Sequence, residues 1–246
     1  MTNVHRQRLV DLLSWMVIII CFVWLWRIVR GQPAFQPGAA VSRTSPSMLP
    51  SDPVSLDGLA TEGIPSAPVV VIEFADFQCP FCKAFVHDTL PAIRGSYIGT
   101  GRVLFAFYQL PLSIHSRAML AAEAAACAAE DGKFWDMHDR LFQTEGELTE
   151  ELSLSYAHDI GLALGRFHDC LRTHPKQAAI KSEALRANAL GVSGTPTFFV
   201  GTMRADRRVQ VRKAFAGAAS VEEFRAILDE VLGSLATRGD LVQQAR

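Results

Sequence analysis

The fold of this chain is limited above all by one run of residues, VVVIEFADF at positions 69–77. Its β-branched and aromatic residues favour a strand, and its almost continuous apolar character is typical of a strand buried on both faces of a sheet. Further strand patterns lie at 103–110, 195–201 and 208–217, with helical patterns between and after them. Strands separated by helices imply an α/β sheet with at least one parallel pair.

The helical residues between the second and third predicted strands form the largest block. It extends from about 113 to 190, which is far longer than the dozen or so residues that one crossover connection needs. We therefore predict a helical subdomain inserted into a small α/β core. A shorter helix is predicted from about Cys82, and a final helix from Val221 to about Leu235.

The N-terminal region carries an apolar block, LVDLLSWMVIIICFVWLW at 9–26. As a helix this block would be about 27 Å long, close to the hydrocarbon thickness of a bilayer, and tryptophans near its ends suit the membrane interface. The alternative is a cleaved signal peptide, but the first cluster of small residues comes only at 38–40. We predict an uncleaved transmembrane anchor in 1–30, followed by a Pro/Ser/Gly-rich tether (31–65), a folded domain (66–236) and a polar tail (237–246).

Two cysteines follow the first predicted strand, in FADFQCPFCKAF at 74–85. The spacing of Cys79 and Cys82 fits a metal site, a structural staple or a redox-active pair. A structural zinc site needs four ligands, but the chain has no second CxxC pair and none of its seven histidines pairs at zinc-finger spacing. A staple across two residues would remove little chain entropy. We therefore predict a redox-active pair and no metal.

The predicted position of the pair also suits redox chemistry. Cys79 would begin a helix, where unpaired N–H groups and the helix dipole stabilise a thiolate. Glu73 interrupts the apolar strand just before it and is either a solvent-facing residue at an edge or a buried carboxylate. We favour the buried carboxylate, which would relay protons to or from Cys82.

Three segments of the chain match one family in the same order: VIEFADFQCPFCKAF (71–85), AMLAAEAAACAAEDGKFWDMHDRLF (118–142) and GVSGTPTFFV (191–200). The region from about 67 to 235 thereby resembles the DsbA-like branch of the thioredoxin superfamily, the thiol-disulfide oxidoreductases of the bacterial cell envelope. The resemblance implies a thioredoxin-like fold with a helical insertion and a cis Pro196 that faces the cysteine pair. Backbone groups of Thr195 would then hold a client chain as an added strand.

The chain departs from the family at one position, and the resemblance does not decide whether a second pair of cysteines is bonded. Phe81 stands where the best-known oxidising members carry histidine, so we expect less help for the thiolate and a weaker oxidant. Cys127 and Cys170 are either two buried thiols or a disulfide that closes a 43-residue interval; we favour the disulfide, which would stabilise the domain by about 3–4 kcal/mol. His87 and His138 are predicted to be satisfied surface or boundary groups, and His115 to help begin a helix.

These observations predict an envelope enzyme that introduces or exchanges disulfides in extracytoplasmic client proteins through Cys79 and Cys82. A membrane redox partner would reoxidise the pair, and no organic cofactor is implied, because the disulfide itself carries the electrons. The alternatives are a membrane-tethered reductase or isomerase and a non-catalytic, client-binding module. The formal net charge of −1, with both signs mixed along the chain, gives no reason to expect nucleic acid as a partner.

Overall fold

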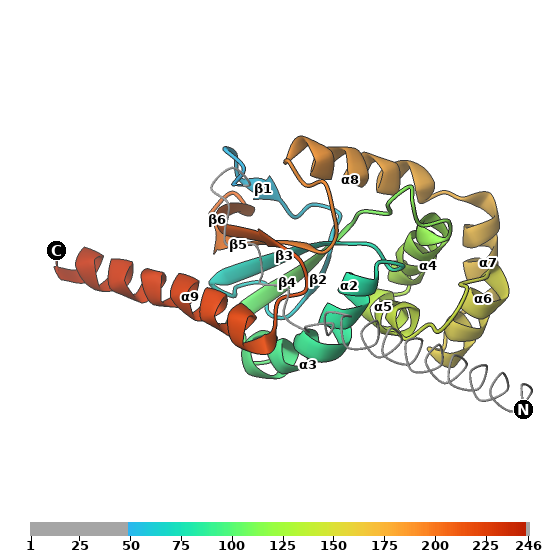
Figure 1. The fold of residues 1–246 in the computed structure, drawn as a ribbon, viewed down its shortest axis with the longest axis horizontal. Helices are drawn as coiled ribbons and strands as arrows, with labels where there is room; N and C mark the ends of the chain where they lie inside the picture. Colours follow the sequence, from blue (N-terminus) through green and yellow to red (C-terminus); the bar gives the residue numbers. More distant parts are fainter. Residues whose placement is uncertain (1–48, 245–246) are drawn as a thin grey trace, which may run out of the picture. The chain divides into compact units, whose positions relative to one another are not determined.

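The computed structural model describes residues 49–244, and these form a mixed α/β domain around one sheet (Figure 1). In this part of the chain the sheet has six strands in the order β1-β6-β5-β3-β4-β2. The central strand β3 pairs in parallel with β4 on one side and antiparallel with β5 on the other. The strands are β1 (Val54–Ser55), β2 (Ala60–Glu62), β3 (Val69–Ala75), β4 (Val103–Gln109), β5 (Thr197–Met203) and β6 (Arg208–Ala216).

Strand β3 is buried along its whole length, as its composition predicts. Successive side chains of a strand point to opposite faces of a sheet, so Val70, Ile72 and Phe74 lie on one face, and Val71 and Glu73 on the other. The first face packs against α8 (Gln177–Ala189) through residues such as Ala187. The second face, which includes Glu73, lies under the helix that carries the cysteines.

The helix after β3 extends without a break through four consecutive segments. It comprises α2, a π-helical turn, α3 and a second π-helical turn, and it packs with α9 on the same face of the sheet. Its apolar contacts join Phe85 to Phe198 and Phe224, with ring centroids 4.6 and 5.3 Å apart. The segments are α2 (Pro80–Ala84), Phe85–Thr89, α3 (Leu90–Ile93), Arg94–Ile98 and α9 (Val221–Gln244).

The predicted helical insertion is confirmed between β4 and β5. Its helices α4 to α7 gather at one side of the sheet, while α8 returns along the face opposite α2 (Figure 1). A disulfide joins Cys127 on α4 to Cys170 on α7, with Cα atoms 6.0 Å apart. The helices are α4 (Ala118–Ala129), α5 (Phe134–Phe142), α6 (Glu150–Asp159), α7 (Leu164–Thr173) and α8.

The boundaries of the domain differ from the prediction. Residues 54–62 were assigned to the tether, yet they contain β1 and β2, which pair with β6 and β4. Strands of two and three residues are too short to show a period in the sequence, and only their partners define them. The last helix also continues to Gln244, into the predicted polar tail.

The predicted membrane anchor at 1–30 lies outside the described residues. Within residues 49–244, no helix is both long enough and apolar enough to cross a membrane.

Candidate active site

The cysteine pair lies where a buried strand gives way to a helix. Cys79 has an extended backbone and immediately precedes α2, whose first residue is Pro80. The Cys79 N–H donates to the Asp76 carbonyl, and the Cys79 carbonyl accepts from the Lys83 N–H, both at 3.0 Å. The backbone N–H groups of Phe81 and Cys82, in the first turn of α2, interact with the Cys79 sulfur, the arrangement that the sequence predicts. Pro80 suits this position, because the first residue of a helix needs no N–H partner.

The loop before β5 lies opposite the cysteines, although it is 116 residues away in the sequence. The Thr195–Pro196 peptide bond is cis, and the Cys79 thiol donates to the Thr195 carbonyl at 3.2 Å. The structure thus brings together four of the predicted site residues: Cys79, Cys82, Thr195 and Pro196. Both Cys79 and Cys82 are free thiols here, whereas Cys127 and Cys170 are bonded.

The two thiols of the pair differ strongly in acidity. The pKa of Cys79 is lowered to about 5, chiefly by a hydrogen bond from the Cys82 thiol and further by Thr195 and the first N–H groups of α2, against the effect of burial. The pKa of Cys82 is raised well above its usual value, mainly because this thiol is buried. A lowered pKa suits a thiol to act as a nucleophile and as a leaving group, and Cys79 has one even though Phe81 supplies no charge.

Glu73 lies on the same face of β3 as the cysteine helix and is completely buried. Neither of its carboxylate oxygens has a hydrogen-bond partner. Burial raises the pKa of Glu73 well above its usual value, the Cys79 thiolate raises it further, and Arg94 lowers it in part. The charge of Glu73 in turn helps to raise the pKa of Cys82. A carboxyl whose pKa is raised in this way, beside a buried thiol, is suited to proton transfer.

Asp76 is a site residue that the sequence analysis missed. Its carboxylate is 1% exposed and accepts hydrogen bonds from the backbone N–H groups of Gln78 and Leu112, both at 2.7 Å. The same carboxylate lies 2.8 Å from Nδ1 of His115. Asp76 thus ties the cysteine turn to the loop after β4, and His115 contributes to this link. A lone aspartate at the end of an apolar strand is the only signal in the sequence.

His138 was predicted to be a surface or boundary group, and this prediction is wrong. The ring is completely buried, its Nε2 atom has no hydrogen-bond partner, and burial lowers its pKa. It lies on the face of α5 that carries Phe134 and Phe142, and its ring centroid is 4.9 Å from that of Phe142. The spacing of four residues between these three rings is the signal that predicts burial. His87, in contrast, is exposed and bonds the Phe142 carbonyl at 3.2 Å.

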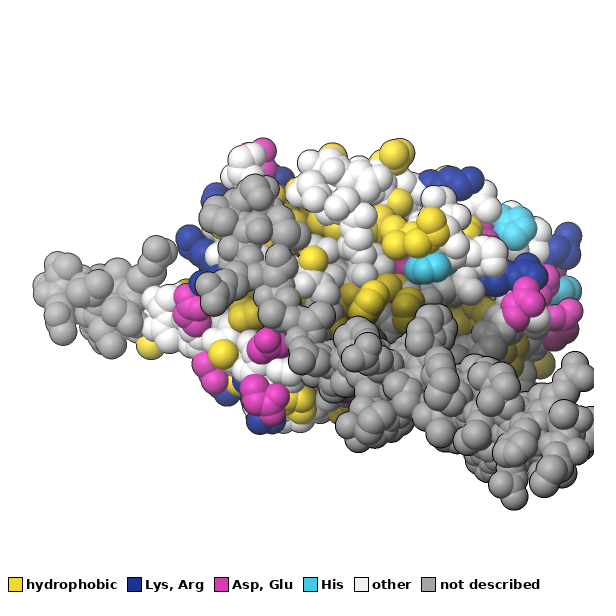
Figure 2. Space-filling model, in the orientation of Figure 1, with side chains coloured by type: hydrophobic (Ala, Val, Ile, Leu, Met, Phe, Trp, Pro, Cys, Tyr) yellow, Lys and Arg dark blue, Asp and Glu magenta, His cyan; other side chains and the backbone are white. Residues whose placement is uncertain are grey.

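The surface around Cys79 is partly apolar. Phe81 and Ile114 are 58% and 81% exposed, and Figure 2 shows apolar side chains exposed on this face of the molecule, over α2 and beside α4. Among the described residues, no group of three or more His, Cys, Asp and Glu side chains is placed to hold a metal ion.

The acidity of Cys79 predicts a pH profile for its alkylation. Because the thiolate is the reactive form, the rate with iodoacetamide should rise with a midpoint near pH 5 and stay level from about pH 6 to 8. Unfolded protein should show no such step below about pH 8, since an ordinary thiol has a pKa near 8.5. Stopped-time alkylation followed by mass spectrometry measures both. An alkylation rate that rises only above pH 8 in the folded protein would contradict the low pKa of Cys79.

A central strand, a dithiol at the start of a helix and a cis-proline facing it define a thioredoxin-type protein. The comparisons agree with this class, since a thioredoxin family profile matches residues 58–230. The solved structures of alpha-DsbA1 from Wolbachia pipientis and of oxidised BdbD from Bacillus subtilis are similar, with TM-scores of 0.66 and 0.59 and identities of 23% and 24%. The match covers 75% of this chain and 96% of the first structure, and 79% and 98% for the second.

Two curated relatives extend the comparison to sequence. A probable disulfide bond formation protein D from Bacillus anthracis is 30% identical over 146 residues, which are 56% of this chain and 67% of that protein. A Na(+)/H(+) antiporter NhaA 3 from Salinispora tropica is 40% identical over 158 residues, which are 64% of this chain but only 23% of the antiporter. The chain thus spans about a quarter of the antiporters that it matches. It belongs to the thioredoxin family, and within it to the DsbA-like thiol-disulfide oxidoreductases.

Proposed function

We propose that this chain introduces disulfides into client proteins through Cys79 and Cys82. In the oxidised pair, a client thiolate attacks the Cys79 sulfur, the Cys79–Cys82 bond breaks, and Cys82 leaves with the electron pair and takes a proton. A second client thiolate then attacks the client sulfur of the mixed disulfide, and Cys79 leaves as a thiolate. The client gains one disulfide, and the pair gains two electrons.

The difference in acidity between the two thiols is the observation that carries this proposal. A lowered pKa makes Cys79 a good leaving group, so the second step is favoured. A raised pKa means that Cys82 must be protonated as it leaves, and we propose that Glu73 supplies this proton. Its burial, its lack of hydrogen-bond partners and its electrostatic effect on the pKa of Cys82 support the role. Backbone groups beside Pro196 are proposed to align the client chain.

The direction of electron flow is testable by the reduction potential of the pair. Because stabilisation of the Cys79 thiolate favours the reduced form, we expect a value near about −120 mV, which is typical of a strong oxidant. The full chain would be equilibrated with glutathione buffers, and the fraction oxidised read by mass spectrometry after alkylation. A value below about −230 mV would favour the alternative, a reductase or isomerase that receives electrons from a membrane partner. A protein that binds clients without exchange in either direction would instead be the non-catalytic module.

We further propose that residues 1–30 anchor the chain in a membrane, with the domain on the extracytoplasmic side and a membrane partner that reoxidises the pair. The uncharged stretch between Leu12 and Trp26 supports the anchor. The disulfide between Cys127 and Cys170 supports an oxidising compartment, where such bonds persist. An antiporter is a membrane protein, so the similarity of this chain to part of one supports a location at a membrane.

A further inference from the structure

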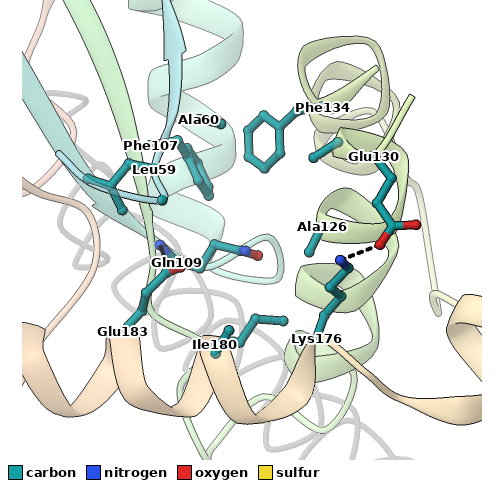
Figure 3. Close-up of a pocket in the computed structure, with 13 residues that line it drawn as sticks. Leu59, Ala60, Phe107, Gln109, Ala126, Glu130, Phe134, Lys176, Ile180 and Glu183 are labelled. Atoms are coloured by element: carbon teal, nitrogen blue, oxygen red, sulfur yellow. Dashed lines mark hydrogen bonds and ion pairs between the residues drawn. The ribbon is translucent and has the colours of Figure 1, made fainter. Parts of the chain in front are cut away.

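A cavity lies away from the cysteines, between one edge of the sheet and the helical insertion (Figure 3). Its volume is about 380 Å³, which is within the range of small-molecule sites. The segment leading into β2, strand β4 and helices α4, α5 and α8 surround it. Its walls are largely apolar and include Leu59, Ala60, Phe107, Ala126, Phe134 and Ile180.

Two polar side chains at the sheet side of this cavity are more than nine-tenths buried. Gln109 is 7% and Glu183 is 8% exposed. A carboxylate oxygen of Glu183 accepts from the Gln109 backbone N–H at 3.2 Å, but Oε1 of the Gln109 amide has no partner. Figure 3 shows the Gln109 amide pointing into the cavity, toward the helices on its far side. A buried acceptor without a donor is costly, so a donor from a bound molecule would complete the site.

The charges around the cavity favour a cation as that donor. Lys176 forms an ion pair with Glu130 on the helical side (Figure 3), and Arg186 bonds the Tyr108 hydroxyl and the Ser182 hydroxyl. Lys176 is therefore paired with a carboxylate, and the hydrogen-bonding groups of Arg186 are directed to hydroxyls rather than to Glu183. Burial raises the pKa of Glu183 to about 7, although the Gln109 N–H and Arg186 act in the opposite direction. Glu183 is the one acidic group at the sheet side of the cavity among the residues that line it.

We propose that this cavity binds a small organic amine, a protonated primary ammonium group on an apolar body. The ammonium donates to the Glu183 carboxylate and to Oε1 of Gln109, and the body packs against the apolar wall beside Phe107 and Phe134, whose rings contact each other with centroids 5.6 Å apart. Glu183 must lose its proton for this contact. Affinity therefore rises from about pH 6 to about pH 8, and each bound amine releases close to one proton at pH 6 and about half a proton at pH 7.

Benzylamine is a suitable probe, with benzyl alcohol and benzoate as neutral and anionic matches of the same shape. The full chain would be titrated with each compound at pH 6, 7 and 8 by calorimetry in two buffers of different ionisation enthalpy, so that proton release is measured directly. We expect benzylamine to bind at one site, about tenfold more weakly at pH 6 than at pH 8. We expect benzyl alcohol and benzoate to bind at least tenfold more weakly than benzylamine at pH 8.

Two variants locate the binding. Glu183→Gln keeps the shape of the side chain but removes its charge, and it should weaken benzylamine binding at least tenfold at pH 8 and abolish the pH dependence. Glu222→Gln makes the same change on the exposed face of α9 and should leave binding unchanged. Absence of benzylamine binding at millimolar concentration, equal binding by Glu183→Gln, or a preference for benzoate would overturn the proposal. If Glu183→Gln does not fold, proton release by the unmodified chain still decides the result.

Discussion

Replacement of Cys79 by serine is expected to reduce disulfide exchange to below about 1% of the unmodified rate. Serine keeps the size of the side chain, but its hydroxyl does not form a disulfide or leave as a stable anion near pH 7. Replacement of Cys82 by serine has a different expected outcome. The Cys79 thiolate can still attack a client disulfide, but no second thiol resolves the product, so mixed disulfides accumulate.

Two measurements check this: oxidation of a peptide with two free cysteines, followed by mass spectrometry, and incubation of each reduced variant with a peptide that contains a disulfide, followed by non-reducing gels to detect mixed disulfides. A variant with both Cys127 and Cys170 replaced by serine is the control, because it removes cysteines outside the Cys79–Cys82 pair. It should retain exchange. Full exchange by Cys79→Ser would refute the assigned roles, and so would mixed disulfides formed equally by both single variants.

Replacement of Glu73 by glutamine is expected to stabilise the domain and slow its chemistry. The pKa of Glu73 is raised in the folded state, so the folded protein holds a proton that the unfolded chain releases above about pH 4.3. The stability that this carboxyl contributes is therefore fully present below that pH and is lost as pH rises toward its folded-state pKa. Glutamine does not ionise and so avoids this loss. The free energy of unfolding of Glu73→Gln should therefore exceed that of the unmodified protein by about 1 kcal/mol or more at pH 8 and by little at pH 4.

The rate should change in the opposite direction. Without an acid to protonate Cys82 as it leaves, we expect exchange to slow at least tenfold, because general acid–base catalysis contributes on the order of 100-fold or more. Urea unfolding of the reduced protein at pH 4, 6 and 8, with Glu145→Gln as an exposed control, measures the stability. A lower stability of Glu73→Gln at pH 8, or an unchanged exchange rate, would show that the carboxyl has another role.

The parts of the site that are local in sequence were predictable, and those that depend on tertiary contacts were not. A buried strand followed by Cys79 and a helix is one continuous segment, so its chemistry follows from the order of residues. The full burial of Glu73 agrees with the favoured interpretation of an apolar strand interrupted once. Asp76 was missed because its partners, the Leu112 N–H and His115, come from another loop. The cavity at Glu183 was missed for the same reason, since it combines several elements that are far apart in the sequence.

The acidity of Cys79 shows how local and distant contributions combine. From the sequence, the start of the helix was the expected source of stabilisation of the thiolate. In the structure the hydrogen bond from Cys82 is the largest cause, and Thr195 adds to it from across the site. A pKa of about 5 is reached without a histidine at position 81, so the expectation of a weaker oxidant, which rested on Phe81 alone, has less support.

The helical insertion leaves and re-enters the sheet at the same end. Strands β4 and β5 flank β3, with Gln109 beside Ala75 and Thr197 beside Phe74, so the two attachment points are about 10 Å apart, or two strand spacings. A helical unit whose ends meet at this distance, and which covers the face of β3 that α8 covers here, would be compatible with the same sheet and dithiol. The insertion is in this sense an exchangeable cassette: selection or engineering can replace helices α4 to α8, and with them the surface beside Cys79, without altering a single strand pairing.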